Sequence, residues 1–250
     1  MARYQVILAY DGTGFTGSQV QANSRTVQGE LERALRNLGW SDRTVIMAGR
    51  TDTGVHATGQ VAAFDFEWAH SADKLLGALN ADLPSDLVVR SLLPASANFH
   101  PRFDAVSREY RYRMFFDPIR DPLREKFLWR AWPDVDGDAL KRNADIFLGR
   151  HDFAAIGSPM KPKGTTVRTV TKAEWKKMPD GEWQFEVRAD AFLYRMVRRL
   201  VFVQVAVAQG RCSVEEIQLA LNGRGKLPAG LAPAQGLSLS NVEYGSLKRY

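Results

Sequence analysis

Hydrophobic and polar residues alternate with a period of two in several short stretches, as in β-strands that bury one face. The alternation predicts strands at residues 3–10, 44–48, 60–66, 87–92, 109–116, 167–177, 183–189 and 237–242. Pro179, Asp180 and Gly181 favour a turn between the strands at 167–177 and 183–189. We therefore expect these two strands to form a hairpin.

Other stretches repeat their apolar residues every three or four positions, which is the spacing of a helix with one buried face. This spacing predicts helices at residues 27–38, 71–80, 138–148 and 192–209. Thr26 and Gly39 suit the start and the end of the first helix. Ser213 and Glu216 form a capping box that begins a further helix.

Strands and helices follow one another without strict alternation, which favours the α+β class. The order of elements in residues 1–104 is similar to that in residues 105–250, although no sequence repeat is evident. We therefore expect two similar α+β halves, with boundaries at 1–104 and 105–250, and a loop in the Gly- and Pro-rich stretch at 223–236.

The composition is typical of a folded protein. Of the 250 residues, 45% are hydrophobic, which is enough for a packed core. The most apolar predicted helix carries Arg195, Arg198 and Arg199, so we do not expect it to span a membrane. Cys212 is the only cysteine, which excludes an intrachain disulfide and a cysteine zinc site. The N-terminus has no apolar signal-peptide core, and we expect a cytoplasmic protein.

The net charge of +6 is concentrated in the second part of the chain. Residues 1–100 hold 8 Lys and Arg against 10 Asp and Glu, a net charge of −2. The other residues hold 26 against 18, a net charge of +8. Such an excess is either a solvated surface without a partner or a surface that binds a polyanion.

One carboxylate, that of Asp52, lies in a stretch that suits a reactive group. Residues 49–59 read Gly-Arg-Thr-Asp-Thr-Gly-Val-His-Ala-Thr-Gly. Asp-Thr-Gly alone is typical of a surface turn. Arg50 lies two residues before Asp52, however, and the threonines flanking Asp52 can donate hydrogen bonds. A carboxylate acts as a nucleophile or general base while it is ionised, a state that nearby cations and donors favour.

Two further motifs predict other functions weakly. Gly12, Gly14 and Gly17 match the dinucleotide pattern G-x-G-x-x-G and suggest an oxidoreductase, but the helix predicted at 27–38 begins too late to meet a pyrophosphate. The histidines lack metal-ligand spacing, so we expect no metal site. His151 and Asp152 follow a glycine that ends a predicted helix, and we expect them to cap that helix.

The second half has an aromatic strand and a basic helix. In the strand at 109–116, Tyr110 and Tyr112 share one face and Arg111 and Arg113 share the other. This pattern fits either an amphipathic strand or an RNA-stacking surface beside a phosphate-binding face. In the helix predicted at 192–209, Arg198 adjoins the apolar stripe, where an arginine usually has a carboxylate partner.

Several segments, in order, resemble the TruA-type tRNA pseudouridine synthases. The resemblance covers nearly the whole chain and includes Tyr10-Asp11-Gly12, Gly49–His56 (G-R-T-D-T-G-V-H), Phe99–Phe103, Arg108–Tyr112, Gly149–Phe153, Phe192 with Met196-Val197-Arg198, and Gly236-Leu237. Departures from the family pattern are Ser18, Thr53, Phe202 and Ser238.

The resemblance implies the pseudouridine synthase fold, with two similar halves that each have a mixed, mostly antiparallel sheet with helices packed on one face. It implies isomerisation of uridine to pseudouridine in the anticodon stem-loop of tRNA, at nucleotides 38 to 40. The nucleophile or base would be Asp52. Arg50 would displace the target base, Tyr110 would stack on the uracil, and Arg198 would pair with Asp52.

The resemblance further implies a homodimer that binds tRNA and uses no metal or organic cofactor. Substrate contacts are expected from Leu237, His56, Arg102, Arg108, Arg111 and Arg195. A tRNA-binding protein without activity would need the basic half but not Asp52, and it remains the main alternative to an enzyme.

Overall fold

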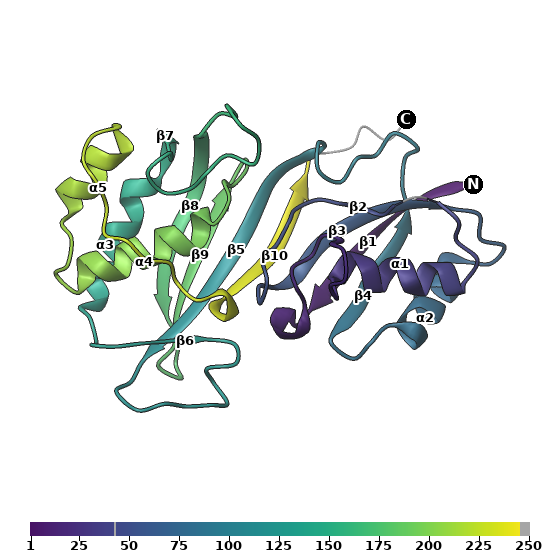
Figure 1. The fold of residues 1–250 in the computed structure, drawn as a ribbon, viewed down its shortest axis with the longest axis horizontal. Helices are drawn as coiled ribbons and strands as arrows, with labels where there is room; N and C mark the ends of the chain where they lie inside the picture. Colours follow the sequence, from purple (N-terminus) through teal and green to yellow (C-terminus); the bar gives the residue numbers. More distant parts are fainter. Residues whose placement is uncertain (43, 246–250) are drawn as a thin grey trace. The chain divides into compact units, whose positions relative to one another are not determined.

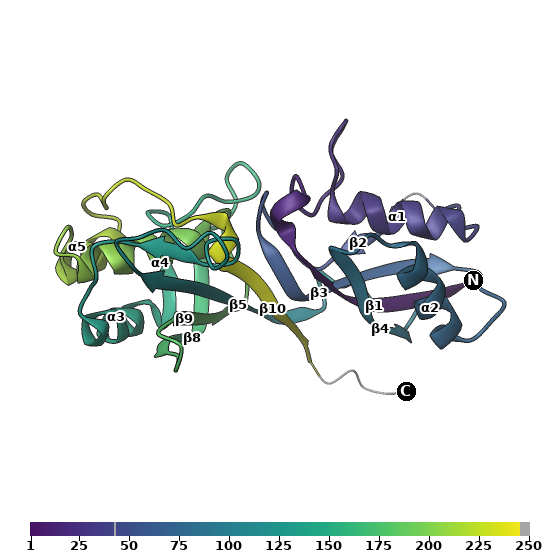
Figure 2. The ribbon, with the colours of Figure 1, turned by 90° about the horizontal axis from the view of Figure 1, so that it is seen from below.

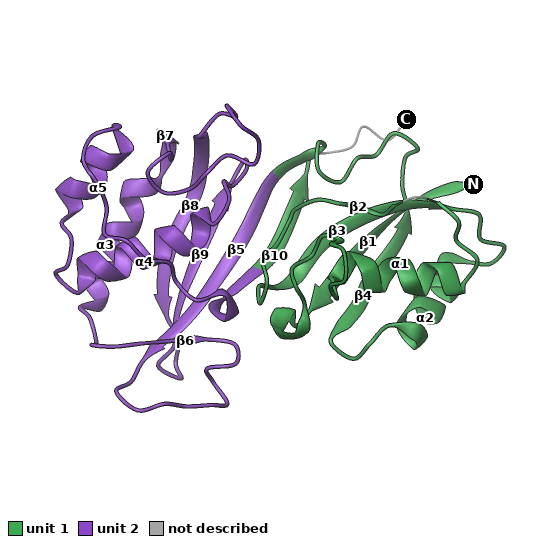
Figure 3. Cartoon of the chain, in the orientation of Figure 1, with its two compact units in different colours: residues 1–106, 239–250 green, residues 107–238 purple. Residues whose placement is uncertain are grey.

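The computed structural model describes residues 1–42 and 44–245. The chain forms two compact units, Met1–Val106 with Leu239–Tyr250, and Ser107–Ser238 (Figure 3). We call them the first and the second unit. Each combines strands with helices, which confirms the α+β class (Figure 1). No helix within the described residues has the length and apolar character needed to cross a bilayer.

The first unit has a sheet in which alternating residues are buried. Its strand order is β4-β1-β3-β10, with β2 also paired to β3. The bounds are β1 (Ala2–Tyr10), β2 (Ile46–Met47), β3 (His56–Phe66), β4 (Leu87–Pro94) and β10 (Leu237–Tyr244). In β1, Tyr4, Val6, Leu8 and Tyr10 are buried, as the period of two predicts. β1 runs antiparallel to both β3 and β4.

Two helices belong to the first unit, and each begins after a capping side chain, of which Thr26 was predicted. Thr26 accepts a hydrogen bond from Gly29 N at the start of α1 (Val27–Asn37), and Ser71 accepts one from Lys74 N at the start of α2 (Ala72–Asp82). Figure 2 shows α1 along one face of the sheet. Capping side chains satisfy amide donors that have no partner inside a helix, so these starts are visible in the sequence.

The glycine run after β1 does not form a dinucleotide site. Gly12–Gly14 is a single 3-10 turn, η1, and α1 begins only at Val27. A Rossmann fingerprint needs its glycines at the helix start, where amide groups meet a pyrophosphate. The weak oxidoreductase alternative therefore has no structural support.

The second unit has a mixed sheet in the order β5-β9-β8-β7, with β6 paired to β5. The bounds are β5 (Ala105–Phe116), β6 (Trp129–Ala131), β7 (Gly149–Asp152), β8 (Val167–Lys177) and β9 (Trp183–Ala189). β8 and β9 form the expected antiparallel hairpin, β9 and β7 are antiparallel to β5 and β8, and β6 runs parallel to β5.

The helices of the second unit are α3 (Gly137–Ala144), α4 (Met196–Ala208) and α5 (Val214–Leu221), with short 3-10 turns η2 (Asp145–Phe147) and η3 (Ala234–Gly236). Trp175 of β8 donates a hydrogen bond to Gln204 of α4 at 2.8 Å, and Gly137 of α3 lies against the Trp183 ring of β9. α3 and α4 therefore cover the aromatic face of this sheet, as expected.

The opposite face of that sheet carries ion pairs. We call it the charged face, and its residues are Glu109, Arg111, Arg113, Lys172, Lys176, Glu182, Glu186 and Arg188. The three glutamates are buried, and each lies next to an arginine or lysine. The strand at 109–116 therefore has its aromatic residues inward and its arginines outward, as the amphipathic interpretation predicts.

A local pattern was wrong at the start of α4. This helix begins at Met196 rather than Phe192, because Tyr194 N donates to Ser158 O at 2.9 Å and Arg195 has a left-handed φ of +61°. A hydrogen bond to a distant residue is not contained in a local pattern. His151 lies in β7, opposite Arg168 of β8, and its Nε2 lies 2.7 Å from the carbonyl oxygen of Leu148, which ends η2, so the ring contacts the end of that helical segment as predicted.

Candidate active site

Asp52 lies on a tight turn between β2 and β3 of the first unit. Val55 N donates to Asp52 O at 3.1 Å, which closes the turn, and Gly54 has a φ of +78°. Residues other than glycine are strained at such a φ, because their Cβ clashes with the backbone. The Asp-Thr-Gly sequence therefore forms the turn it predicts, with Asp52 half-buried.

Thr51, the residue before Asp52, is anchored by three hydrogen bonds. Its hydroxyl lies 2.8 Å from the Tyr10 hydroxyl, Thr51 N donates to Ser18 Oγ at 2.8 Å, and Ser18 N donates to Thr51 O at 3.0 Å. Tyr10, Ser18 and Thr51 are all buried. Buried hydrogen bonds are costly to break, so this side of the loop has a defined position.

The other side of the loop is held by Gln60 of β3. Gln60 Nε2 donates to Gly49 O at 2.9 Å, and Gly49 N donates to Gln60 Oε1 at 3.3 Å. Burial raises the pKa of Tyr10 to about 12, so its hydroxyl keeps its proton at neutral pH. The side chains that anchor Gly49 and Thr51 are thus uncharged.

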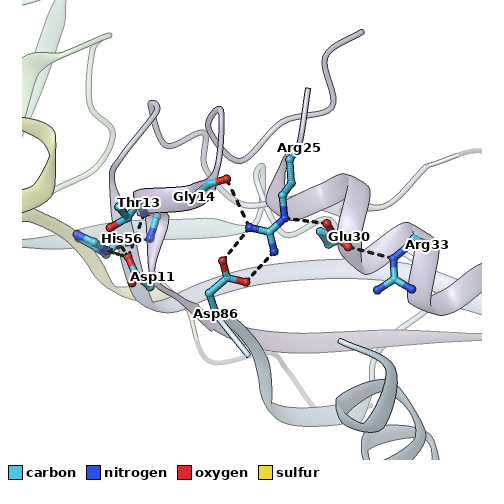
Figure 4. A network of polar contacts seen from close by, with 9 residues as sticks. Asp11, Thr13, Gly14, Arg25, Glu30, Arg33, His56 and Asp86 are labelled. Carbon is cyan, nitrogen blue, oxygen red and sulfur yellow. Dashed lines mark hydrogen bonds and ion pairs between the residues drawn. The ribbon is translucent and has the colours of Figure 1, made fainter. Parts of the chain in front are cut away.

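His56 joins the end of the Asp52 loop to η1. Gly12 N donates to His56 Nδ1 at 2.9 Å, and the same nitrogen lies 3.2 Å from Asp11 Oδ1 (Figure 4). A Cβ at Gly12 would come within 2.1 Å of Val55 O, so only glycine permits this approach. Because Nδ1 accepts from an amide, the structure favours the tautomer with its proton on Nε2. His56 therefore positions two loops.

An arginine-centred network holds the next part of η1. Arg25 donates to both carboxylate oxygens of Asp86 at 2.8 Å, and also to Glu30 at 3.0 Å and Gly14 O at 3.4 Å (Figure 4). The Arg25 hydrogen bond lowers the pKa of Asp86. This network ties η1 to the start of α1, on the same side of the unit as His56.

In the second unit, Tyr110 and Tyr112 lie on the aromatic face of β5. Tyr110 packs edge-on against Phe192, with ring centroids 5.0 Å apart. Tyr112 is fully buried, and its hydroxyl donates to Pro233 O at 2.8 Å. Burial raises the pKa of Tyr112 well above its usual value. Tyr112 is thus a core residue, whereas Tyr110 lies near the rim of the core.

Arg198 lies in the first turn of α4 and is tied to the loop before η3. Its Nε donates to Ala232 O at 2.7 Å, and Ala232 N donates to Arg198 O at 3.3 Å. The Arg198 charge acts to lower the pKa of buried Tyr112, against the larger effect of burial. Leu237 follows η3 and is buried.

Comparison with known proteins identifies the family. A family model described as tRNA pseudouridine synthase matches residues 6–104 and 144–245. The chain belongs to this family.

Curated relatives in this family match over nearly the full length. The tRNA pseudouridine synthase A of Halalkalibacterium halodurans is 39% identical over 99% of this chain and 95% of its own length. The corresponding proteins of Brevibacillus brevis and Chloroflexus aurantiacus are 39% and 41% identical, over 98% of this chain and 100% and 89% of their own lengths. This chain is therefore an isomerase that acts on uridine in tRNA.

The residues expected to carry pseudouridine synthase chemistry come from both units. Asp52, Arg50 and His56 belong to the first unit, and Tyr110, Arg198 and Leu237 belong to the second. Arg50 is exposed beside the half-buried Asp52. The pairing of Asp52 with Arg198 stays a prediction.

The remaining expected substrate contacts lie in different settings. Arg102 is exposed beside Phe103, and Arg108 donates to Asp190 O at 3.0 Å. Arg195 lies over the Tyr194 ring at 4.7 Å. Arg111 lies on the charged face, 3.3 Å from Glu186 and on the opposite side of β5 from Tyr110. Whether these residues of the synthase bind tRNA stays a prediction.

Sequence reasoning missed the residues that position the Asp52 loop of this synthase. Tyr10, Ser18 and Gln60 hold the loop but lie up to 41 residues away from the partner they contact. In the sequence, Ser18 is evident only as a departure from the family pattern. Its hydroxyl is the acceptor for Thr51 N, so the departure places a hydrogen-bonding group at the loop.

Proposed function

We propose that this chain isomerises uridine to pseudouridine in the anticodon stem-loop of tRNA, with Asp52 as the reacting carboxylate. The observation that carries the proposal is the loop itself. Asp52 lies on a closed turn, its neighbour Thr51 is anchored by three buried hydrogen bonds, and the surrounding signature is that of the family. A reacting group held this firmly needs little reorganisation during the reaction.

The reaction breaks the bond between ribose C1′ and uracil N1 and forms a bond between C1′ and uracil C5. Asp52 either attacks C1′, giving a covalent ester, or removes the proton at C2′, giving a glycal. In both routes the detached uracil rotates and C5 bonds to C1′. The ester route then releases the Asp52 carboxylate from C1′, and the glycal route returns the proton from Asp52 to C2′. The C5 proton is lost while N1 gains one. Atoms and electrons balance without a cofactor, and water must stay excluded to prevent hydrolysis.

The other residues support that step. The target uridine must leave the helical stack, which costs a few kcal/mol. Arg50 is exposed and available to displace the base, and Tyr110 offers an aromatic ring on which the uracil stacks. Arg198, with a guanidinium positioned by Ala232 O, favours the ionised form of Asp52 when the two pair. Leu237, His56, Arg102, Arg108, Arg111 and Arg195 are proposed substrate contacts.

The proposal includes a cytoplasmic homodimer that binds tRNA and needs no metal or cofactor. Two features support the tRNA binding and the cofactor-free chemistry. The net charge of +8 on residues 101–250 suits a polyanionic substrate, and the chemistry requires only a carboxylate and cations.

The test replaces Asp52 by Asn, which keeps the size of the side chain but removes its charge. We expect Asp52→Asn to fold, to bind unmodified tRNA with unchanged affinity, and to release no tritium from tRNA containing 5-tritiated uridine. Asp82→Asn is the matched control, since Asp82 lies in the same unit and accepts a hydrogen bond from Arg33 at the surface. Substantial tritium release by Asp52→Asn, measured against that control, would contradict the assignment. Such release would indicate that another residue reacts with the uridine. A wild-type protein that binds tRNA but releases no tritium would favour the alternative of a tRNA-binding protein without activity.

A further inference from the structure

A turn of the first unit holds an aromatic ring in solvent. Phe103 is 76% exposed, more than any other aromatic side chain in the described part of the chain, where Trp132 follows at 55%. Exposing a phenylalanine forgoes the stabilisation of about 1.5–3 kcal/mol that burial would provide. An exposed ring of this kind calls for a functional reason when its position is also well defined.

The turn around Phe103 is closed by four internal hydrogen bonds. Asp104 N donates to His100 O at 3.0 Å, and His100 N donates to Asp104 Oδ2 at 2.8 Å. Arg102 N and Phe103 N donate to His100 Nδ1 at 3.2 and 3.3 Å. These bonds require Nδ1 to carry no proton, and they fix the backbone from which the Phe103 side chain projects.

The base of the turn is anchored in the first unit. Phe99 is buried and packs edge-on against Tyr244, with ring centroids 5.1 Å apart. Tyr244 OH donates to Pro101 O at 2.8 Å, and Arg3 Nη1 donates to Phe99 O at 2.9 Å. The exposed ring therefore projects from a turn whose base is held by packing and hydrogen bonds to the rest of the first unit.

Aromatic and cationic groups surround the Phe103 ring. The His100 ring lies 4.2 Å from it, centroid to centroid, at 30°, and the Arg102 guanidinium lies 6.0 Å from its centroid. A ring that is 76% exposed although His100 covers part of it has its other face open to solvent. An open aromatic face beside a cation is the arrangement on which single-stranded RNA bases stack next to their phosphates.

We propose that Phe103, backed by His100, is a stacking platform for an unpaired nucleobase of the RNA substrate, with Arg102 contacting the adjoining phosphate. The inference rests on the proposed function, since it assigns a second contact to the same tRNA. RNA is favoured over a protein partner because the neighbours of Phe103 in the turn, Arg102 and Asp104, are charged and exposed, whereas protein interfaces place their aromatic anchors in apolar surroundings.

The test compares three replacements at Phe103 in the full-length protein, with an unmodified tRNA transcript as the probe. Phe103→Ala should raise the Kd for the transcript, and the KM for pseudouridine formation, about ten- to a hundredfold at unchanged kcat. Phe103→Tyr should restore both, because it keeps the ring. Phe103→Leu should remain weak, because it keeps apolar area but has no aromatic face.

Leu93→Ala is the matched control, because Leu93 is another exposed apolar residue of the first unit, at 61%. It should leave Kd and KM within about twofold, which is within the usual effect of surface changes. Circular dichroism and light scattering establish that each variant is folded and has the wild-type oligomeric state.

The outcomes separate the platform from the proposed function. Wild-type protein that forms pseudouridine, together with a Kd within twofold for Phe103→Ala, overturns the platform alone. A change of oligomeric state in Phe103→Ala, with RNA affinity retained, overturns it in favour of a contact between protein chains. Wild-type protein that binds the transcript through Phe103 but forms no pseudouridine overturns the proposed activity and leaves the platform.

Discussion

The Asp52 loop of the first unit and the charged face of the second unit both bury polar side chains. The buried groups have neutral hydrogen-bonding partners at the loop and partners of opposite charge on the charged face. Around the loop, Tyr10, Ser18 and Gln60 anchor Thr51 and Gly49 through neutral hydrogen bonds. On the charged face, buried glutamates are matched by arginines and lysines.

The difference follows from what each region has to do. Neutral anchors fix the backbone of the loop without adding charges to those of the arginines proposed to act at the site, and each added charge would alter the ionisation of Asp52. On a sheet surface no such restriction applies, and charges of opposite sign on neighbouring strands stabilise the pairing.

The largest effect is expected from Arg198→Ala. Removing the cation proposed to pair with Asp52 should lower kcat by at least about a hundredfold with little change in KM, and move the acidic limb of the pH–kcat profile to higher pH. Steady-state tritium release across pH measures both. Arg113→Ala, which removes a cation from the charged face, should leave kcat within about twofold. An unchanged pH profile in Arg198→Ala would argue against the pairing.

Tyr10→Phe should change stability with a sign that depends on pH. At pH 7 the variant should be about 1 kcal/mol less stable, because Thr51 loses a buried hydrogen bond. The pKa of Tyr10 is raised from 10.0 to about 12 by burial. Above pH 10 the unfolded state loses this proton while the folded state keeps it, so wild-type stability falls by about 1.4 kcal/mol per pH unit up to pH 12.

Tyr10→Phe has no such hydroxyl, so its stability does not fall in this way. The difference in stability between the variant and wild type should therefore vanish near pH 11. Urea unfolding at pH 7, 9 and 11 measures the difference. Buried Tyr112 adds its own alkaline sensitivity to both proteins and cancels in the comparison. A deficit that is constant with pH would show that the Tyr10 hydroxyl is not buried in the folded protein.

Glu186→Gln should have the smallest effect, a loss of about 0.5 kcal/mol of stability at pH 7. Burial raises the pKa of Glu186, but Lys172, Lys176 and Arg111 outweigh it, so the net pKa is lowered from 4.5. A carboxyl with a lowered pKa stabilises the fold above its unfolded value, and the stabilisation is lost as pH falls through the folded value.

The difference in stability between wild type and Glu186→Gln should therefore shrink as the pH falls below 4.5, as measured by urea unfolding. Glu174→Gln is the control, because Glu174 is half exposed and pairs with Lys176 at 3.1 Å. An equal loss in both variants would mean that burial of Glu186 adds nothing to its ion pairs.

Much of the fold could be predicted because its signals are local. The capping residues Thr26, Ser71 and Ser213 mark helix starts, since they satisfy amides a few residues away. The alternation of β1 and of the β8–β9 hairpin follows from having one buried face. β6 and β7 escaped prediction because three- and four-residue strands are specified by their neighbours rather than by their own pattern.

The candidate site divides in the same way. Asp52, Arg50 and Gly54 could be recognised because the turn and the signature lie within a few residues of one another. The β5 face containing Tyr110 followed from the period of two, but the pairing of Arg111 with Glu186 required the register of β5 with β9. The left-handed Arg195, which delays α4, depends on the bond between Tyr194 and Ser158.

Residue types at short spacings are enough to predict the α+β class, the family and the carboxylate proposed to react. The residues that hold this carboxylate in place are known from the folded chain alone. Tyr10, Ser18 and Gln60 meet the Asp52 loop because β1, the segment after η1 and β3 are brought together by sheet pairing and burial. Hydrogen bonds between distant residues form only when the backbone groups they satisfy are removed from water together, and no local pattern encodes that event.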